Sequence, residues 1–340
     1  MPDFTTHVLF GELLLSRMPQ EMREEALAAG AAYFWGAQGP DPLFYAGGLK
    51  GDNALRKLGG QMHRRHPQQL LEELVRSARD ASPEEKPLLK AYALGFLAHY
   101  CLDRQVHPYV YFLVERRKRA LPEDCWPSIH GRVECHIDDL LYPRMKEGRP
   151  VQSFRPKDYC PLDEALAASL ARLYRRLAGT LYGQAPSSEE LAQAFRACLR
   201  YTCLFYGPFR GITAWLARFA DRRARCPGLY SSHVKGLLAG DDNDVLNLHQ
   251  RPWRNLCRPE EGPSVLSVPQ LLEEAAQAWL ELALPLWEGM EGRGEELPPV
   301  EGTFDEGNPR PPREDDPQED AADQPEETGG KLPASSLSQE

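Results

Sequence analysis

The segment LKAYALGFLAHYCLDRQVH, residues 89–107, decides the character of this chain. It is mostly apolar, yet it carries His99, Asp103 and His107, each four residues from the next. Residues four apart lie on one face of a helix, and each step rises by about 6 Å. The segment therefore predicts a buried helix with one polar stripe. Pro108 is expected to end or kink that helix near its last histidine.

Helix signals also dominate the sequence on both sides of this segment. Capping boxes, in which a serine precedes Glu or Gln by three positions, occur at Ser82, Ser187 and Ser267. Apolar residues recur at helical spacing in segments 5–17, 21–33, 68–79, 163–182 and 189–204. Alternating strand patterns with Asn-Gly or Asp-Gly turns are absent. The predicted class is all-α, a bundle of many helices.

The C-terminal end of the sequence has a different composition. Residues 293–340 are rich in Pro, Glu, Asp, Gly and Ser, with Phe304 as the one aromatic residue. Such a segment cannot bury enough apolar surface to offset the entropy lost on ordering. We therefore expect a helical domain over residues 1–292 and a disordered acidic tail over 293–340.

Charge is distributed in the same uneven way. Residues 301–340 carry 12 acidic and 3 basic side chains, whereas the other 300 residues carry 38 and 37. A nearly neutral body offers no basic face for double-stranded nucleic acid. The chain also lacks a run of 18 apolar residues, and its first basic residue is Arg17. We therefore expect neither a membrane span nor a signal peptide.

The eight cysteines are scattered through helix-like sequence, and none of them form a Cys-x-x-Cys pair. This pattern disfavours a cysteine-type zinc ribbon. It predicts reduced, buried thiols in a cytoplasmic protein.

The polar stripe raises the question of a metal site. A carboxylate and two imidazoles are costly to bury unless they are paired or bind a metal. A second pair, His130 and Glu134, has the same four-residue spacing. Chance alone would produce about as many such pairs in this composition, so spacing does not decide the matter. A metal site and a satisfied buried polar network both account for it.

Further histidines and one aspartate that could bind a metal lie in the same part of the chain. Seven of the nine histidines fall within residues 1–136. His7 lies in the first predicted helix, and His63 and His66 lie in QMHRRHP. Asp41 occupies a Gly- and Pro-rich loop, where a carboxylate is often a simple turn residue.

Taken in order, these motifs resemble the zinc-dependent phospholipase C family. The series is His7, GPD at 39–41, MHRRH at 62–66, His99-x-x-x-Asp103-x-x-x-His107 and His130-x-x-x-Glu134. It spans residues 1 to about 145. The family includes bacterial phospholipases C, and the related fungal single-strand nucleases share its all-helical fold with a trinuclear zinc centre. The resemblance therefore implies the same fold and two or three Zn²⁺ ions here.

The resemblance also implies a role for each position. One zinc would be held by Asp41, His63, His99 and Asp103, with His66 as the alternative to His63. A second zinc would be held by His107, His130 and Glu134. A third would be held by His7 with the amine and carbonyl of the first residue, and Asp103 would bridge it to the first zinc. Asp41 would also act as the general base.

The activity implied by the resemblance is hydrolysis of a phosphodiester by zinc-activated water. A glycerophospholipid substrate would give diacylglycerol and a phosphorylated head group, and would require transient contact with a membrane surface. Two alternatives stay open. One is a nuclease or small-molecule phosphodiesterase, and the other is a non-catalytic helical binding protein that retains the fold.

One aromatic stretch lies outside these motifs. Residues 201–219, YTCLFYGPFRGITAWLARF, combine large apolar side chains with helical spacing. We expect them to form helix core rather than a lipid-binding surface.

Overall fold

Helices form nearly all the regular structure in the computed structural model, which describes residues 3–48, 53–120, 125–236, 244–293 and 297–309. Within these ranges no β-strand occurs, which confirms the predicted all-α class. The twelve α-helices found there are α1 (Phe4–Leu15), α2 (Gln20–Ala28), α3 (Gly30–Ala37), α4 (Ala54–Arg64), α5 (Pro67–Arg79), α6 (Lys86–Ala120), α7 (Trp126–Met145), α8 (Pro156–Tyr159), α9 (Glu164–Tyr182), α10 (Ser188–Tyr206), α11 (Arg210–Ala224) and α12 (Val268–Met290).

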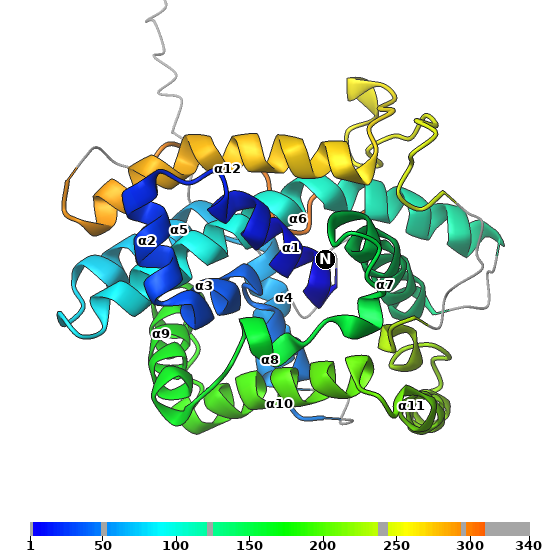
Figure 1. Ribbon diagram of the computed structural model, residues 1–340, viewed down its shortest axis with the longest axis horizontal. Coiled ribbons are helices and arrows are strands. Elements are labelled where there is room, and N and C mark those ends of the chain that lie inside the picture. The colour runs from blue at the N-terminus through cyan, green and yellow to red at the C-terminus, as the bar shows by residue number, and fades with distance from the viewer. Residues whose placement is uncertain (1–2, 49–52, 121–124, 237–243, 294–296, 310–340) are drawn as a thin grey trace, which may run out of the picture. The chain divides into compact units, whose positions relative to one another are not determined.

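Helix α6 is the centre of this arrangement and contains the segment 89–107 (Figure 1). Its 35 residues span about 52 Å, and α1, α3, α5, α7 and α12 pack around it. Neither α6 nor any other helix in the described ranges is long and apolar enough to cross a membrane.

Of the two effects expected at Pro108, the helix end is wrong, because α6 continues to Ala120. An internal proline costs a helix about 3 kcal/mol. Val110 and Val114, which follow it, are fully buried. Burial of an aliphatic side chain contributes about 1.5–3 kcal/mol, so two such residues offset the lost backbone hydrogen bond.

Two glycines let α3 and α6 cross in close contact. A Cβ on Gly36 would lie 2.1 Å from the Tyr92 carbonyl oxygen, and one on Gly95 would lie 2.0 Å from that of Tyr33. Only glycine fits at both positions. This crossing brings the loop after α3, and with it the 3₁₀ helix η1 (Asp41–Tyr45), to the polar stripe of α6.

Most predicted helices are observed, with local differences at their ends. The capping boxes at Ser187 and Ser267 are confirmed, whereas α6 begins four residues after Ser82. The predicted helix over 21–33 is divided at Ala29, whose backbone angles (φ −115°, ψ 40°) leave the helical region.

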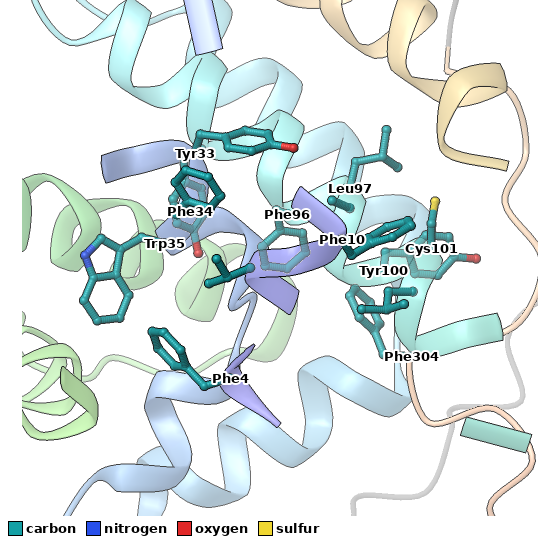
Figure 2. Close-up of a cluster of buried hydrophobic side chains, with 14 of the residues drawn as sticks. Phe4, Phe10, Tyr33, Phe34, Trp35, Phe96, Leu97, Tyr100, Cys101 and Phe304 are labelled. Atoms are coloured by element: carbon teal, nitrogen blue, oxygen red, sulfur yellow. The ribbon is translucent and has the colours of Figure 1, made fainter. Parts of the chain in front are cut away.

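The structure differs from the predicted tail at residues 297–309, which we call the C-terminal strap. The ring of Phe304 is fully buried, and its centroid lies 5.0 Å from that of Tyr100. Figure 2 shows the two rings side by side. The Tyr100 hydroxyl also donates a hydrogen bond of 2.7 Å to the Glu301 carbonyl. The composition of a long acidic segment does not reveal that one aromatic side chain within it can anchor part of the segment to the domain. Residues 310–340 lie outside the described residues.

The cysteines also depart from expectation. Cys125, which precedes α7, and Cys226, which follows α11, form a disulfide with their Cα atoms 5.7 Å apart. The expectation of reduced thiols is therefore wrong for this pair, since a pairing across 101 residues leaves no mark in local spacing. Disulfides are typical of proteins that fold in oxidising compartments. The cytoplasmic location stays a prediction, and this pair does not favour it.

The prediction that residues 201–219 form helix core holds for Tyr206, which is buried, but is wrong for the large side chains from Phe209 onward. Phe209 and four side chains of α11 are exposed, and we call this group the α11 apolar face: Phe209, Ile212, Trp215, Leu216 and Phe219. The side of α11 that faces the protein carries small residues instead, Ala214, Ala217 and Ala220.

Candidate metal centre

The eight side chains selected from the sequence meet where α1, α4, α6, α7 and η1 come together. They form three groups, the first two of which share His99, and in each group the possible ligand atoms lie within 4.8 Å of one another. The groups are His7, Asp41 and His99; His63, His99 and Asp103; and His107, His130 and Glu134.

The first cluster contains two histidines and two aspartates. His63 Nε2 lies 3.2 Å from Asp41 Oδ1, and His99 Nε2 lies 3.2 Å from Asp103 Oδ2. The two crosswise distances, His63 to Asp103 and His99 to Asp41, are both 3.9 Å. Burial by itself would lower the pKa of His63, but the neighbouring carboxylates of Asp41 and Asp103 outweigh it and raise that pKa.

His7 adjoins this cluster from α1. Its Nε2 lies 3.3 Å from Asp103 Oδ1, and its ring stacks on His99 with centroids 4.3 Å apart. Asp103 thus points one oxygen at His7 and the other at His99, an arrangement suited to a bridging carboxylate. The amine and carbonyl of the first residue, the further ligands implied by the resemblance, lie outside the described residues.

The second cluster lies one turn further along α6 and is completed by α7. Glu134 Oε1 is 2.7 Å from His130 Nε2 and 3.8 Å from His107 Nε2. Burial would raise the pKa of Glu134, but the neighbouring His130 outweighs it and lowers that pKa. Glu134 is therefore an ionised carboxylate between two imidazoles.

Electrostatics keep the first cluster in a form that can bind a cation. Burial would raise the pKa of Asp103, but the surrounding imidazoles of His99, His107 and His7 hold it well below its usual range. Burial lowers the pKa of His99, and it does the same for His130 in the second cluster. Asp103 and Glu134 are thus held as carboxylates, and His99 and His130 as neutral imidazoles, the protonation states that metal ligands need.

Hydrogen bonds to the backbone orient three of the rings. In each ring Nδ1 faces a backbone carbonyl, which leaves Nε2 toward the cluster. The contacts are His63 to Gly59 at 2.7 Å, His99 to Ala37 at 3.1 Å, and His107 to Phe304. Gly39 adds close packing, because a Cβ there would lie 2.3 Å from the His99 ring.

A buried carboxylate on α7 fixes the start of α1 and hence His7. Asp138 accepts hydrogen bonds from the backbone N–H groups of Thr5 and Thr6, at 3.1 and 2.9 Å. A negative charge is stabilising at a helix N-terminus, where these donors are unpaired. Lys235 donates to the same carboxylate at 2.9 Å, so the charge is balanced within the protein.

The possible ligand atoms of the first cluster and of His7 are suited to binding a metal ion. Among the described residues, these buried atoms have no hydrogen-bond partner: His7 Nε2, Asp41 Oδ1, His63 Nε2, His99 Nε2, and both carboxylate oxygens of Asp103. Leaving this many polar atoms unsatisfied in a protein interior is costly. Nitrogen and carboxylate oxygen at these positions are the ligands that Zn²⁺ accepts.

Geometry separates His63 from its alternative, His66. His66 precedes α5 with a left-handed backbone (φ 59°), is exposed, and belongs to none of the three groups. His63 is buried within the first cluster. The structure therefore favours His63 as the possible ligand.

Sequence reasoning missed the C-terminal strap as part of the site. The Phe304 ring packs against His63 and His99, with centroids 5.7 and 5.8 Å apart. The Asp305 backbone N–H donates to the His63 carbonyl at 3.1 Å, and its carboxylate accepts from the Tyr111 hydroxyl. The only signal in the sequence was a single aromatic residue in an acidic segment.

The family profile described as zinc-dependent phospholipase C matches residues 6–183, just over half of the chain and all eight clustered residues. The chain therefore belongs to the zinc-dependent phospholipase C family. Comparisons with curated proteins and with solved structures gave no match.

Proposed function

We propose that this protein is a zinc-dependent hydrolase of phosphodiester bonds, acting on glycerophospholipids in the manner of a phospholipase C. The observation that carries the proposal is the set of buried, unsatisfied ligand atoms in the first cluster. Family membership supports the same chemistry. The proposed products are diacylglycerol and a phosphorylated head group.

The proposed zinc ligands follow the clusters. Asp41, His63, His99 and Asp103 would hold one ion, and His107, His130 and Glu134 a second, with His7 placed to contribute to a third. Bound zinc would lower the pKa of a water molecule and neutralise charge on the phosphoryl oxygens.

The two aspartates of the first cluster are suited to different tasks. The Asp103 side chain is fully buried, whereas that of Asp41 is 12% exposed. We assign Asp41 as the general base, because a group that takes a proton from attacking water must be reachable from solvent. Asp103, enclosed between His7 and His99, would serve as a metal ligand and hold both rings in place.

The first experiment is metal analysis by inductively coupled plasma mass spectrometry. The protein would be purified without a histidine tag or chelator. Two or three zinc ions per chain are expected. Less than half a zinc per chain, even after zinc is added back, would refute the hydrolase proposal and favour the non-catalytic binding protein.

Substitution of the bridging carboxylate then links metal to turnover. Asp103→Asn preserves shape but weakens coordination, so it should lower the zinc content and abolish hydrolysis of phosphatidylcholine without changing the far-ultraviolet circular dichroism. Asp80→Asn, at a carboxylate that is 49% exposed, is the matched control and should behave as the native protein. Unchanged phosphodiester hydrolysis in Asp103→Asn would refute the site assignment. A panel that includes single-stranded DNA and small phosphodiesters separates the lipid substrate from the alternatives.

A further inference from the structure

The α11 apolar face is an unusual feature for a helix in a soluble fold. Its side chains are 73% exposed at Phe209, 61% at Ile212, 62% at Trp215, 54% at Leu216 and 53% at Phe219. The spacing of three or four residues places them on one stripe of the helix. Contiguous exposed apolar side chains of this kind mark interaction surfaces.

Basic residues are concentrated in the same segment of the chain. Residues 200–225 contain six arginines and a single acidic residue, Asp221, in a protein whose net charge is −10. All six arginines are exposed, and none has an ion-pair partner among the described residues: Arg200, Arg210, Arg218, Arg222, Arg223 and Arg225. The carboxylate of Asp221 is buried and turned inward. The outer side of α11 is therefore both apolar and cationic.

Several bonds fix the orientation of α11. Asp221 accepts hydrogen bonds from the backbone N–H of Gly228 and Tyr230, at 3.0 and 2.7 Å, and from the Ser231 hydroxyl at 2.6 Å. The disulfide from Cys226 to Cys125 ties the end of the helix to the start of α7. Turning the apolar side chains inward would break the Asp221 contacts, so the face is held outward.

Packing contacts connect α11 to one of the helices of the metal centre. The 3₁₀ helix η3 (Ser231–His233) packs against both α11 and α7. Helices α7 and α11 are labelled in Figure 1, and α7 carries His130 and Glu134. A Cβ on Gly131 would lie 3.0 Å from His233 Nε2. Helix η3 thus links α11 to the helix that bears the second cluster.

We propose that the α11 apolar face and its arginines form a docking surface for a phospholipid bilayer that contains anionic lipid. Trp, Phe and Leu side chains insert at the boundary between head groups and acyl chains, and flanking cations attract anionic head groups. The six arginines, which have no acidic partner in the part of the chain that the structure describes, favour this occupant over an apolar protein surface. The role of docking in turnover rests on the proposed function, whereas docking itself is measured independently of hydrolysis.

Trp215 provides an intrinsic fluorescent reporter of vesicle binding. Of the six tryptophans, Trp215 alone is exposed, and the others are buried or half-buried. The native protein would be mixed with vesicles of phosphatidylcholine, with and without phosphatidylglycerol. A blue shift of Trp215 fluorescence, quenching by brominated lipid, and weaker binding at high salt are expected with the anionic vesicles. Asp103→Asn is measured in parallel so that hydrolysis does not alter the vesicles.

A double variant tests whether the side chains of the α11 apolar face bind the vesicle. Trp215→Gln with Phe219→Gln should weaken vesicle binding, measured by sedimentation, by about tenfold or more. The matched control is Leu27→Gln with Leu284→Gln, which removes leucines that are 56% and 48% exposed on α2 and α12. This control should bind as the native protein does. Turnover of a soluble short-chain phosphodiester should be unchanged in both double variants.

Two results would overturn the docking surface. One is equal vesicle binding by the native protein and the α11 variant. The other is a native protein that does not bind vesicles but forms dimers that the α11 variant loses, which would make the face a contact between copies. Vesicle binding without any phosphodiester hydrolysis would refute the proposed function and leave the docking surface standing.

Discussion

Phe304→Ala tests whether the C-terminal strap is part of the metal centre. The ring is fully buried and contacts Phe96, Tyr100, His63 and His99. Replacing a buried phenylalanine by alanine costs about 3–5 kcal/mol. For a domain of this size that corresponds to a fall in melting temperature of roughly 5–15 °C.

A second effect is expected on zinc affinity. The substitution removes the surface on which His63 and His99 rest, and it loosens the backbone carbonyl that accepts from His107. Loss of a group that orients metal ligands usually weakens affinity by about 10–100-fold. We expect the dissociation constant for zinc to rise by that factor.

The assay combines thermal unfolding with competition against a chromogenic zinc chelator. Phe154→Ala is the matched control, because that buried ring packs on Phe4, Tyr142, Tyr159 and Tyr206, none of which is a candidate ligand. It should lose similar stability but keep its zinc affinity. Equal zinc affinity in Phe304→Ala and the native protein would show that the strap only covers the fold.

Three further predictions concern the ligand set, pH and the chain end. His63→Ala should lower zinc content, whereas His66→Ala should not; metal analysis showing the reverse would move the ligand to His66. Burial raises the pKa of Asp139 to about 6 from 3.8. The folded state therefore binds this proton more tightly, and its stability falls as pH rises between these values. Asp139→Asn should accordingly raise the unfolding free energy by up to about 3 kcal/mol near neutral pH and much less near pH 4; a pH-independent difference in denaturant titrations would contradict this. Removing 310–340 should leave the melting temperature within about 2–4 °C. Removing 297–340 should lower both melting temperature and zinc content, and equal behaviour of the two truncations would show that the strap is dispensable.

Some features follow from local sequence because they depend on neighbours a few residues apart. Apolar spacing predicted α5, α9 and α10 closely, and the Ser187 and Ser267 boxes mark true helix starts. The His99-x-x-x-Asp103 stripe lies on one helical face, as its spacing requires. Local sequence did not show where α6 ends, because burial of the residues beyond Pro108 outweighs the helix-breaking effect of proline.

Other features were decided by contacts between distant parts of the chain. The motif QMHRRHP does not show which of its two histidines is the ligand. Whether His63 or His66 faces Asp41 depends on how the end of α4 packs against η1. The pairing of Cys125 with Cys226 and the seating of Phe304 under His63 join residues more than 100 positions apart.

The sequence by itself thus determined the helical class and the types of ligand available, since both depend on periodicity and on side-chain chemistry. Only the tertiary structure decided which side of α11 faces outward, because amphipathic spacing shows that a stripe exists but not what covers it. Its alanines pack inward, and Asp221 and the disulfide hold its aromatic side chains toward solvent. Whether a side chain is buried depends on how the whole chain packs, and in this fold the apolar stripe of α11 lies on the surface.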